Sequence, residues 1–289
     1  MPVDPVFFMS QAFHSICILG GGLLGGSLAL ALGEARLWVR KASALELAKN
    51  IGLKSATDDL AYAVAGADLL ILAVPVGAMP ALLAAAVAAG LPKHCLVTDV
   101  GSVKRTPHLA LAPILKESSN PFIGSHPMAG SEQNGLTAAR ADLFANAACL
   151  LTNDSAASDQ QCAALELFWK SLRCRVRWMG AEQHDGLVAR ISHLPHVTAA
   201  ATAFASLSAD SNEGQFAGGG LRDTTRVAGG NPEMWAEILM ENRAEVSRSL
   251  RETIAKLNEF LDSLNRSDQE QLFHLLAEAK VLRDTLPKI

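Results

Sequence analysis

The sequence lacks an excess of positive charge. Its 25 Lys and Arg residues stand against 29 Asp and Glu residues, which gives a net charge of −4 at pH 7. Proteins bind a nucleic-acid backbone or an anionic lipid surface mainly through surplus Lys and Arg side chains. The charge balance therefore argues against nucleic acid and membrane surfaces as partners.

Long hydrophobic runs are also missing. The apolar runs at 69–74 and 82–89 fall far short of the roughly 20 residues that a helix needs to span a bilayer. The first 13 residues contain no Lys or Arg, and glycines interrupt the apolar run at 16–30, so no signal peptide is indicated. We expect a cytoplasmic protein.

Cysteine is scarce, and the cysteines are not spaced as paired motifs. The chain has 5 cysteines, an odd number, and none belongs to a C-x-x-C pair. This pattern is typical of reduced thiols in the cytosol. We expect neither a disulfide framework nor a zinc site, and no metal.

The remaining composition is that of a folded protein with two domains. A length of 289 residues suits two domains, and 49% hydrophobic against 19% charged residues argues against disorder. Up to about residue 150, short apolar runs alternate with Ala- and Leu-rich stretches, which is typical of βαβ units and a parallel sheet. The expected strands are 15–19, 36–39, 69–74, 95–100 and 122–124, then one near 148–152 and an edge strand at 173–179. The expected helices are 24–32, 42–51, 60–65 and 78–89, followed by an amphipathic stretch at 158–171.

The second half shows no strand signal. After Gly180 the apolar residues recur at spacings of three and four, which predicts helices only. Asn231 with Pro232 predicts the start of a long helix that reaches about Leu264, and the run from Ser267 to Glu270 predicts a capping box for the last helix. Long Ala-rich helices often pack against a second subunit, so we expect a homodimer through this half. The fold class is then an α/β, Rossmann-type doubly wound sheet at 14–180 plus an all-α substrate and dimerisation domain at 181–289.

A glycine-rich turn follows the first expected strand. Gly20, Gly22 and Gly25 form G-x-G-x-x-G between a strand and a helix, the place where a dinucleotide pyrophosphate binds the helix N-terminus. We expect Leu23 and Leu24, at the helix start, to take part in this cofactor site. The alternative is a glycine-rich turn without a ligand.

The end of the second expected strand indicates which dinucleotide binds. An NAD-binding protein places Asp or Glu there for the ribose hydroxyl, whereas this chain has Arg40, Lys41 and Ser43. These side chains suit a 2′-phosphate, so we expect NADP, with NAD possible. The alternative is that Arg40 and Lys41 form a solvated surface pair. Val74 and Pro75 end the strand expected beside the ribose.

Four further segments carry a resemblance. Residues 98–104 (TDVGSVK), 124–132 (GSHPMAGSE), 192–196 (SHLPH) and 218–226 (GGGLRDTTR) occur in this order. Together they make the chain similar to the prephenate/arogenate (cyclohexadienyl) dehydrogenases of tyrosine biosynthesis, from about residue 14 to about 265. The resemblance implies oxidative decarboxylation of a cyclohexadienol, in which a hydride goes to the nicotinamide and the ring carboxylate leaves as carbon dioxide. The substrate is prephenate or arogenate, and the sequence leaves the choice open.

The resemblance also implies roles for particular residues. His126, expected just after a strand at the carboxyl edge of the sheet, is the candidate acceptor of the substrate hydroxyl proton. Ser102 matches the serine that shares this hydroxyl and approaches the nicotinamide, with Gly101 beside it at the cofactor. The alternative is that Ser102 only caps a helix beginning at Val103. Arg226 matches the arginine that binds the substrate's side-chain carboxylate as a fork, and Arg222 supports it or binds a second carboxylate.

Further candidates lie in the same segments. His193 and His196 flank a proline that should kink their helix. His196 is assigned to the substrate pocket and His193 to its support, although each also fits an ordinary buried histidine. The remaining expected substrate-binding residues are Ser125, Glu132 and Gly219.

Two other kinds of protein remain open at this point. One is a different NADP-dependent reductase, such as a pyrroline-carboxylate reductase or a β-hydroxyacid dehydrogenase. The latter needs a catalytic lysine, and the candidate stretch 187–207 has none. The other is a non-catalytic NADP-binding regulator. We expect no fused chorismate mutase domain and no regulatory amino-acid-binding domain.

Overall fold

The computed structural model describes residues 12–130 and 133–287. The described chain forms two compact units, one ending at Asn242 and the other beginning at Arg243. Within the described ranges no helix has both the length and the apolar character needed to cross a membrane.

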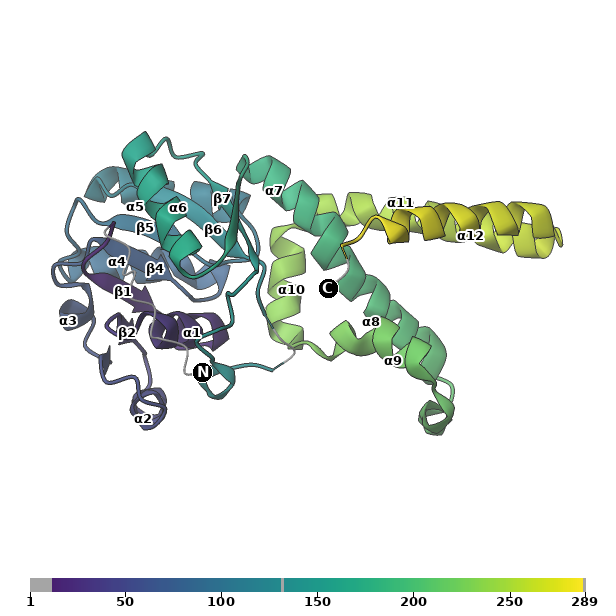
Figure 1. Cartoon of the computed structure of the whole chain (residues 1–289), viewed down its shortest axis with the longest axis horizontal. Helices are drawn as coiled ribbons and strands as arrows, with labels where there is room; N and C mark the ends of the chain where they lie inside the picture. The colour runs from purple at the N-terminus through teal and green to yellow at the C-terminus, as the bar shows by residue number, and fades with distance from the viewer. Residues whose placement is uncertain (1–11, 131–132, 288–289) are drawn as a thin grey trace, which may run out of the picture. The chain divides into compact units, whose positions relative to one another are not determined.

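The described residues of the first unit form one sheet of 8 strands in the order β3-β2-β1-β4-β5-β6-β7-β8 (Figure 1). All neighbouring strands are parallel except β6 and β7. The strands are β1 (Ile16–Leu19), β2 (Arg36–Trp38), β3 (Ala56–Thr57), β4 (Leu69–Leu72), β5 (Leu96–Asp99), β6 (Phe122–Pro127), β7 (Ala148–Thr152) and β8 (Arg175–Trp178). The predicted doubly wound sheet is confirmed, and β8 lies at its edge as expected.

Helices cover both faces of this sheet. They are α1 (Leu23–Leu32), α2 (Ala42–Asn50), α3 (Leu60–Val64), α4 (Met79–Ala88), α5 (Arg105–Ser118) and α6 (Asp159–Ser171). Because both faces are covered, a central strand is a continuous apolar run, and every residue of β4 is fully buried.

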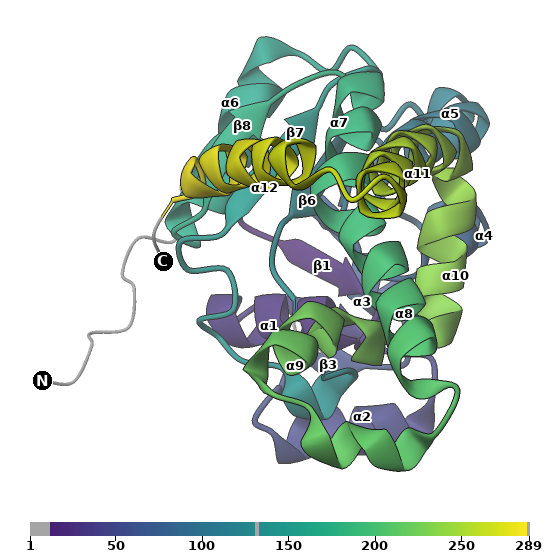
Figure 2. The ribbon, with the colours of Figure 1, turned by 90° about the vertical axis from the view of Figure 1, so that its right-hand side faces the viewer.

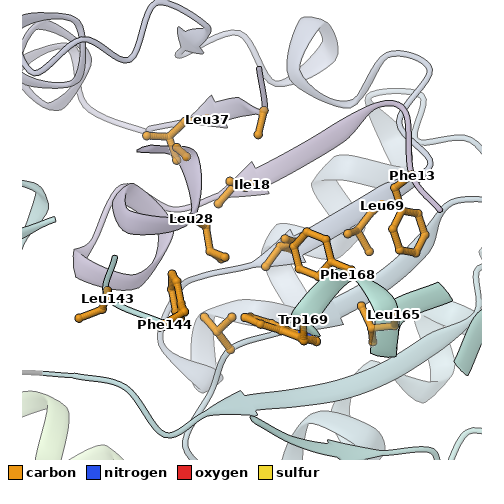
Figure 3. Packing of buried hydrophobic residues seen from close by; sticks show 14 of the residues in the cluster. Phe13, Ile18, Leu28, Leu37, Leu69, Leu143, Phe144, Leu165, Phe168 and Trp169 are labelled. Carbon is orange, nitrogen blue, oxygen red and sulfur yellow. The ribbon is translucent and has the colours of Figure 1, made fainter. Parts of the chain in front are cut away.

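Successive residues of the strands enter two different cores. Leu69 and Ile71 join the cluster that contains Phe168 and Trp169 of α6, which Figure 3 shows from close by. Leu70 and Leu72 join the cluster on the opposite face. This alternation is the period of two that a strand imposes on its side chains.

Strand β6 is longer than expected. The sequence predicted an end at residue 124, but Gly124–Pro127 continue as the antiparallel partners of β7, with His126 opposite Leu150. His126 therefore lies inside a strand and not after one, and this placement corrects the expectation. The long-range pairing with β7, which no local pattern encodes, extends the strand.

The rest of the first unit is helical, as predicted (Figure 2). It consists of α7 (Ala181–Val188), a π-helical turn (Ala189–His193), α8 (Leu194–Leu207), a 3-10 turn (Ser211–Phe216), α9 (Gly219–Thr225), a 3-10 turn (Arg226–Gly229) and α10 (Pro232–Glu241). The π turn stands just before Pro195, which has no N–H to donate to the preceding turn. The distortion expected near this proline is therefore present as a widened turn.

Two expectations for the C-terminal helices are wrong. The single helix expected from Pro232 to about Leu264 is divided at Asn242, between α10 and α11 (Arg243–Asn265), because Asn242 leaves helical geometry at φ −108° and ψ 23°. The last helix, α12 (Gln269–Asp284), is capped by Asp268, whose carboxylate accepts from the Gln271 amide. Ser267 has a left-handed φ of 55° and does not cap.

Candidate active site

The glycine-rich turn joins β1 to α1 and requires glycine at two of its positions. Gly20 has a φ of 122°, and a Cβ there would lie 2.3 Å from the Ala73 carbonyl oxygen. A Cβ on Gly25 would lie 1.9 Å from the Gly20 carbonyl oxygen. At Gly22, by contrast, a Cβ would have no heavy atom of the described residues within 4 Å.

The N-terminus of α1 suits a phosphate group. Its first turn contains no acidic residue, and no side chain in the described part of the chain caps it. The first amides of a helix have no partner within the helix and carry a partial positive charge. Leu23 and Leu24 supply such amides beside the open space at Gly22.

The end of β2 lies next to this turn. The Gly20 amide donates to the Trp38 carbonyl at 3.0 Å. Arg40, Lys41 and Ser43 follow directly and are exposed. Neither basic side chain forms an ion pair with any described residue.

The end of β4 also borders the glycine turn. Val74 and Pro75 follow β4, and a Cβ on Gly20 would lie 2.8 Å from the Val74 Cγ1 atom. The candidate cofactor residues of β1, β2 and β4 thus lie at the same carboxyl edge of the sheet, as expected for a doubly wound fold.

The turn after β5 brings Ser102 to the same edge. The Gly101 amide donates to Asp99 Oδ2 at 2.9 Å, and a Cβ at Gly101 would crowd that oxygen, so the turn is tight. The alternative in which Ser102 only caps a helix beginning at Val103 is wrong. Helix α5 begins at Arg105, and the amides of Lys104 and Arg105 donate to the Asp185 carboxylate at 2.7 and 3.0 Å.

His126 reaches this edge on β6 and is almost completely buried, with 7% exposure. Its Nδ1 lies 2.9 Å from Nε2 of His184, and Nδ1 of His184 lies 2.8 Å from Oδ1 of Asp185. Burial lowers the pKa of His126 well below the usual value, and the neighbouring His184, Lys104 and His193 lower it further. His126 is therefore a neutral imidazole at neutral pH.

A buried ion pair stands behind this histidine. Lys104 and Asp99 are both fully buried, and the Lys104 Nζ donates to Asp99 Oδ2. Burial lowers the pKa of Lys104, while the adjacent Asp99 carboxylate opposes this shift. The amide of Ser125 also donates to Asp99, at 3.1 Å.

Ser125 itself points away from His126. Its side chain is fully buried, lies 2.7 Å from the Thr98 hydroxyl, and accepts a hydrogen bond from the Trp169 indole at 3.0 Å. Adjacent residues of a strand face opposite sides of the sheet. The structure therefore does not bring the Ser125 hydroxyl together with the other candidate substrate-binding groups.

The helical part brings several expected residues together. The His196 ring stacks on Trp235 with centroids 3.3 Å apart, and its Nδ1 donates to the Ser192 carbonyl at 3.0 Å. Burial lowers the pKa of His196, and the nearby Arg226 charge adds to the effect. Arg226 is thus close to the stacked pair.

His193 is fully buried beside them. Its Nδ1 lies 3.2 Å from Asn242 Nδ2, and among the described residues nothing bonds to its Nε2. Burial lowers its pKa to about 4. A buried ring nitrogen without a partner is costly, so Nε2 fits a position that faces a ligand.

Three expected substrate-binding residues are less informative. Arg222 and Gly219 belong to α9 and are exposed. Glu132 lies outside the described residues.

Sequence reasoning missed the groups that surround His126. His184 and Asp185 are adjacent in the chain, and an acid beside a histidine in an amphipathic helix is the only local signal they carry. Lys104 stands at the end of the segment that contains Ser102, yet its burial against Asp99 depends on the packed sheet. Asn242, expected to lie inside a helix, donates to the Asp185 carbonyl at 2.8 Å.

A glycine-rich turn suited to a phosphate group and a buried neutral histidine, both at one edge of a doubly wound sheet, define a nicotinamide-dependent oxidoreductase. Two family models together match most of the chain. The prephenate dehydrogenase nucleotide-binding domain matches residues 37–178, and the prephenate dehydrogenase dimerization domain matches residues 180–278. The chain belongs to the prephenate dehydrogenase family of tyrosine biosynthesis.

Individual relatives agree with this assignment. The cyclohexadienyl dehydrogenase of Zymomonas mobilis is 34% identical over 94% of this chain and 95% of its own length. The prephenate dehydrogenase of Aquifex aeolicus, solved with hydroxyphenyl propionate and NAD+, has a TM-score of 0.83 at 26% identity and covers 95% of this chain and 98% of its own. The arogenate dehydrogenase of Synechocystis has a TM-score of 0.77 at 30% identity and covers 94% of this chain and 99% of its own.

The glycine turn yields a test by substitution. Gly22→Ala should leave stability unchanged, because its φ of −84° suits alanine and the space is open. Its methyl group should, however, raise the dissociation constant of the dinucleotide by about 10–100-fold, since it would fill the place expected for the pyrophosphate. Fluorescence titration and urea unfolding measure the two effects.

The matched variant is Gly25→Ala. It should lower the unfolding free energy by about 2 kcal/mol or more, because the new Cβ meets a backbone oxygen. Unaltered dinucleotide binding by Gly22→Ala would contradict the placement of the pyrophosphate at this turn.

Proposed function

We propose that this chain catalyses the NADP-dependent oxidative decarboxylation of prephenate or arogenate. The observation that carries the proposal is His126, a buried neutral imidazole on β6 at the same sheet edge as the glycine turn and Ser102. Membership of the family favours this reaction over the other NADP-dependent reductases. Residues 14–180 form the cofactor domain in this proposal, and 181–289 form the substrate and dimerisation domain.

The carboxyl edge of the sheet would hold the cofactor. Gly22, Leu23 and Leu24 would bind the pyrophosphate through backbone amides. The ribose would lie along Val74, Pro75 and Gly101. When bound, the nicotinamide would accept a hydride from the ring carbon that carries the hydroxyl.

His126 would take the hydroxyl proton of the substrate at Nε2, the ring nitrogen that does not face His184. Hydride departure is easier from a carbon whose oxygen has alkoxide character, and a neutral imidazole provides that assistance. After the hydride has left, the bond to the ring carboxylate breaks, its electrons enter the ring, and carbon dioxide departs. The proton can then return from His126 to the phenolate oxygen, which restores the base.

The carboxylate groups of the substrate would bind to the helical part of the first unit. Arg226 would hold the side-chain carboxylate as a bidentate fork, and Arg222, one turn earlier, would support it. His196, stacked on Trp235, would form one wall of the pocket. His193 would direct its unpartnered Nε2 toward the substrate.

The first test measures turnover of prephenate and of arogenate with NADP and with NAD, followed by nicotinamide absorbance. His126→Asn should lower kcat/KM by about 100-fold to 10,000-fold while NADP still binds, because the proton acceptor is lost. The control is His94→Asn, which replaces an exposed histidine and should retain full activity. NADP binding without turnover of either substrate would move the function to another reductase or to a non-catalytic regulator.

The same assay followed against pH tests the protonation state of the base. Because the pKa of His126 is lowered, its neutral form persists as the pH falls through about 6.5, the usual histidine value. The kcat/KM value should therefore stay level through that pH and decline only below it. A decline that begins above neutrality would contradict the assignment.

Arg40 tests the choice of cofactor. Arg40→Ala should raise the dissociation constant of NADP by about 10–100-fold, because a charge-assisted bond to the 2′-phosphate is lost, and should leave NAD binding within about twofold. Lys49→Ala, also exposed and in neighbouring α2, is the matched control and should change neither value. Equal effects on NAD and NADP would overturn the NADP preference.

The second unit supports the homodimer that belongs to this proposal. Helix α11 carries exposed apolar side chains at spacings of three and four, and α12 adds four more exposed apolar side chains. Exposed apolar stripes of this kind mark association surfaces. The side chains are Ile254, Leu257, Leu261, Leu264, Phe273, Leu276, Val281 and Leu282.

Sedimentation measures the oligomeric state. The wild type should sediment as a dimer, whereas the double variant Leu257→Glu/Leu261→Glu should be monomeric, because two buried charges would oppose the interface. Glu252→Lys changes an exposed polar position of the same helix and should remain dimeric. A dimeric double variant would place the interface elsewhere.

A further inference from the structure

A hydrogen-bonded chain of three side chains ends at His126. It runs from Asp185 through His184 of α7 to His126 of β6. His184 is fully buried and Asp185 is 2% exposed, so bulk water does not compete for these bonds. The position of each proton in this hydrogen-bonded chain can therefore be deduced from the terminal group that can only accept hydrogen bonds.

Asp185 is that end. Its carboxylate accepts from the amides of Lys104 and Arg105, and these fixed N–H groups require acceptor oxygens. Burial would raise the pKa of Asp185, but the hydrogen bonds from His184 and the two amides outweigh it and lower the pKa. Asp185 is therefore an ionised carboxylate, and the nitrogen of His184 that faces it must carry a proton.

The position of the remaining protons follows. Burial holds the pKa of His184 below its usual value, so the ring is neutral and has one proton, which is on Nδ1. Its Nε2 then has a lone pair and accepts. His126 must donate from Nδ1 to this lone pair, which leaves Nε2 of His126 without a proton.

We propose that His184 and Asp185 are positioning residues that hold His126 in the tautomer protonated at Nδ1, so that Nε2 is always the proton-accepting nitrogen. This inference rests on the proposed role of His126 as the base. A carboxylate or backbone group that fixes the tautomer of a functional histidine through its second nitrogen is a known physical device. Here the carboxylate acts through an intervening imidazole.

The hydrogen-bonded chain from Asp185 to His126 also stabilises the positive charge that His126 acquires on protonation. When Nε2 takes a proton, the positive ring donates from Nδ1 to His184, and the Asp185 carboxylate lies at the far end of the same chain. The other charged and titratable groups near the pair are Lys104, which is paired with Asp99, and His193, which is neutral. Asp185 is therefore the counter-ion that supports the charged intermediate.

The tautomer can be read directly by NMR without any turnover. A long-range proton–nitrogen correlation spectrum of the full-length protein with isotope-labelled histidine distinguishes protonated from unprotonated ring nitrogens. The sequence contains 8 histidines, and the signals that disappear in His126→Asn identify His126. We expect a protonated Nδ1 and an unprotonated Nε2 in the wild type. A proton on Nε2 of His126, or a mixture of tautomers, would overturn the proposal.

Two substitutions of His184 connect the tautomer to the rate. His184→Phe removes the acceptor, so signals of the Nε2-protonated tautomer should appear, and kcat should fall by about 10–100-fold with KM within about twofold. In His184→Gln the amide NH₂ faces Asp185 and its oxygen accepts from His126, so the tautomer and a larger part of kcat should be retained. If His184→Phe does not fold, the wild-type and His184→Gln spectra still show which nitrogen of His126 carries the proton, and so test the proposal.

The matched control is His108→Gln. His108 is also a buried histidine with two hydrogen bonds, to the hydroxyls of Thr152 and Ser155, but it is not connected to His126. This substitution should leave the tautomer of His126 unchanged. A fall in kcat in His184→Phe with an unchanged tautomer would show a merely structural role and would contradict the proposal.

The spectra also separate this proposal from the proposed function. Absence of turnover with the expected tautomer would contradict only the reaction assigned to the chain. Turnover with the opposite tautomer would contradict only the role of His184 and Asp185.

Discussion

The carboxylate of Asp185 joins three parts of the site that are far apart in the chain. It accepts from two amides at the start of α5, which follows the Ser102 turn, and from His184, which contacts His126. A buried carboxylate is tolerated only when its oxygens are bonded, and each of these bonds depends on the others being formed. Helix α7 is therefore held against the sheet by the same interaction that orients the candidate base.

The buried pair of Lys104 and Asp99 has a related effect. Such a pair adds little to stability, because the cost of removing both charges from water offsets their attraction. Its position suggests an electrostatic role. The Lys104 charge lies near His126 and His184, and it contributes to lowering the pKa of both rings. Burial and the Lys104 charge thus keep both histidines neutral, as a general base requires.

The parts of the structure that the sequence predicted are those that local chemistry determines. The turn from Gly20 to Gly25 is recognisable because the backbone there excludes any side chain at two positions, and β4 because a strand covered on both faces must be apolar. His184 meets His126 across 58 positions of sequence, and no periodicity encodes that contact. The break at Asn242 was missed for the same reason, since the asparagine is held by Asp185 and His193 of a different helix.

Strand β6 shows why core packing and chemistry cannot vary independently in this fold. Ser125 faces the core, where its hydroxyl bonds to Thr98 and Trp169, whereas its neighbour His126 faces the site. A shift of one residue in the pairing with β7 would exchange the two side chains, burying an imidazole beside Trp169 and placing a hydroxyl against His184. Each exchange would leave buried polar atoms without hydrogen-bond partners. The pairing register that gives the core polar groups their partners is therefore the same register that places His126 in the site.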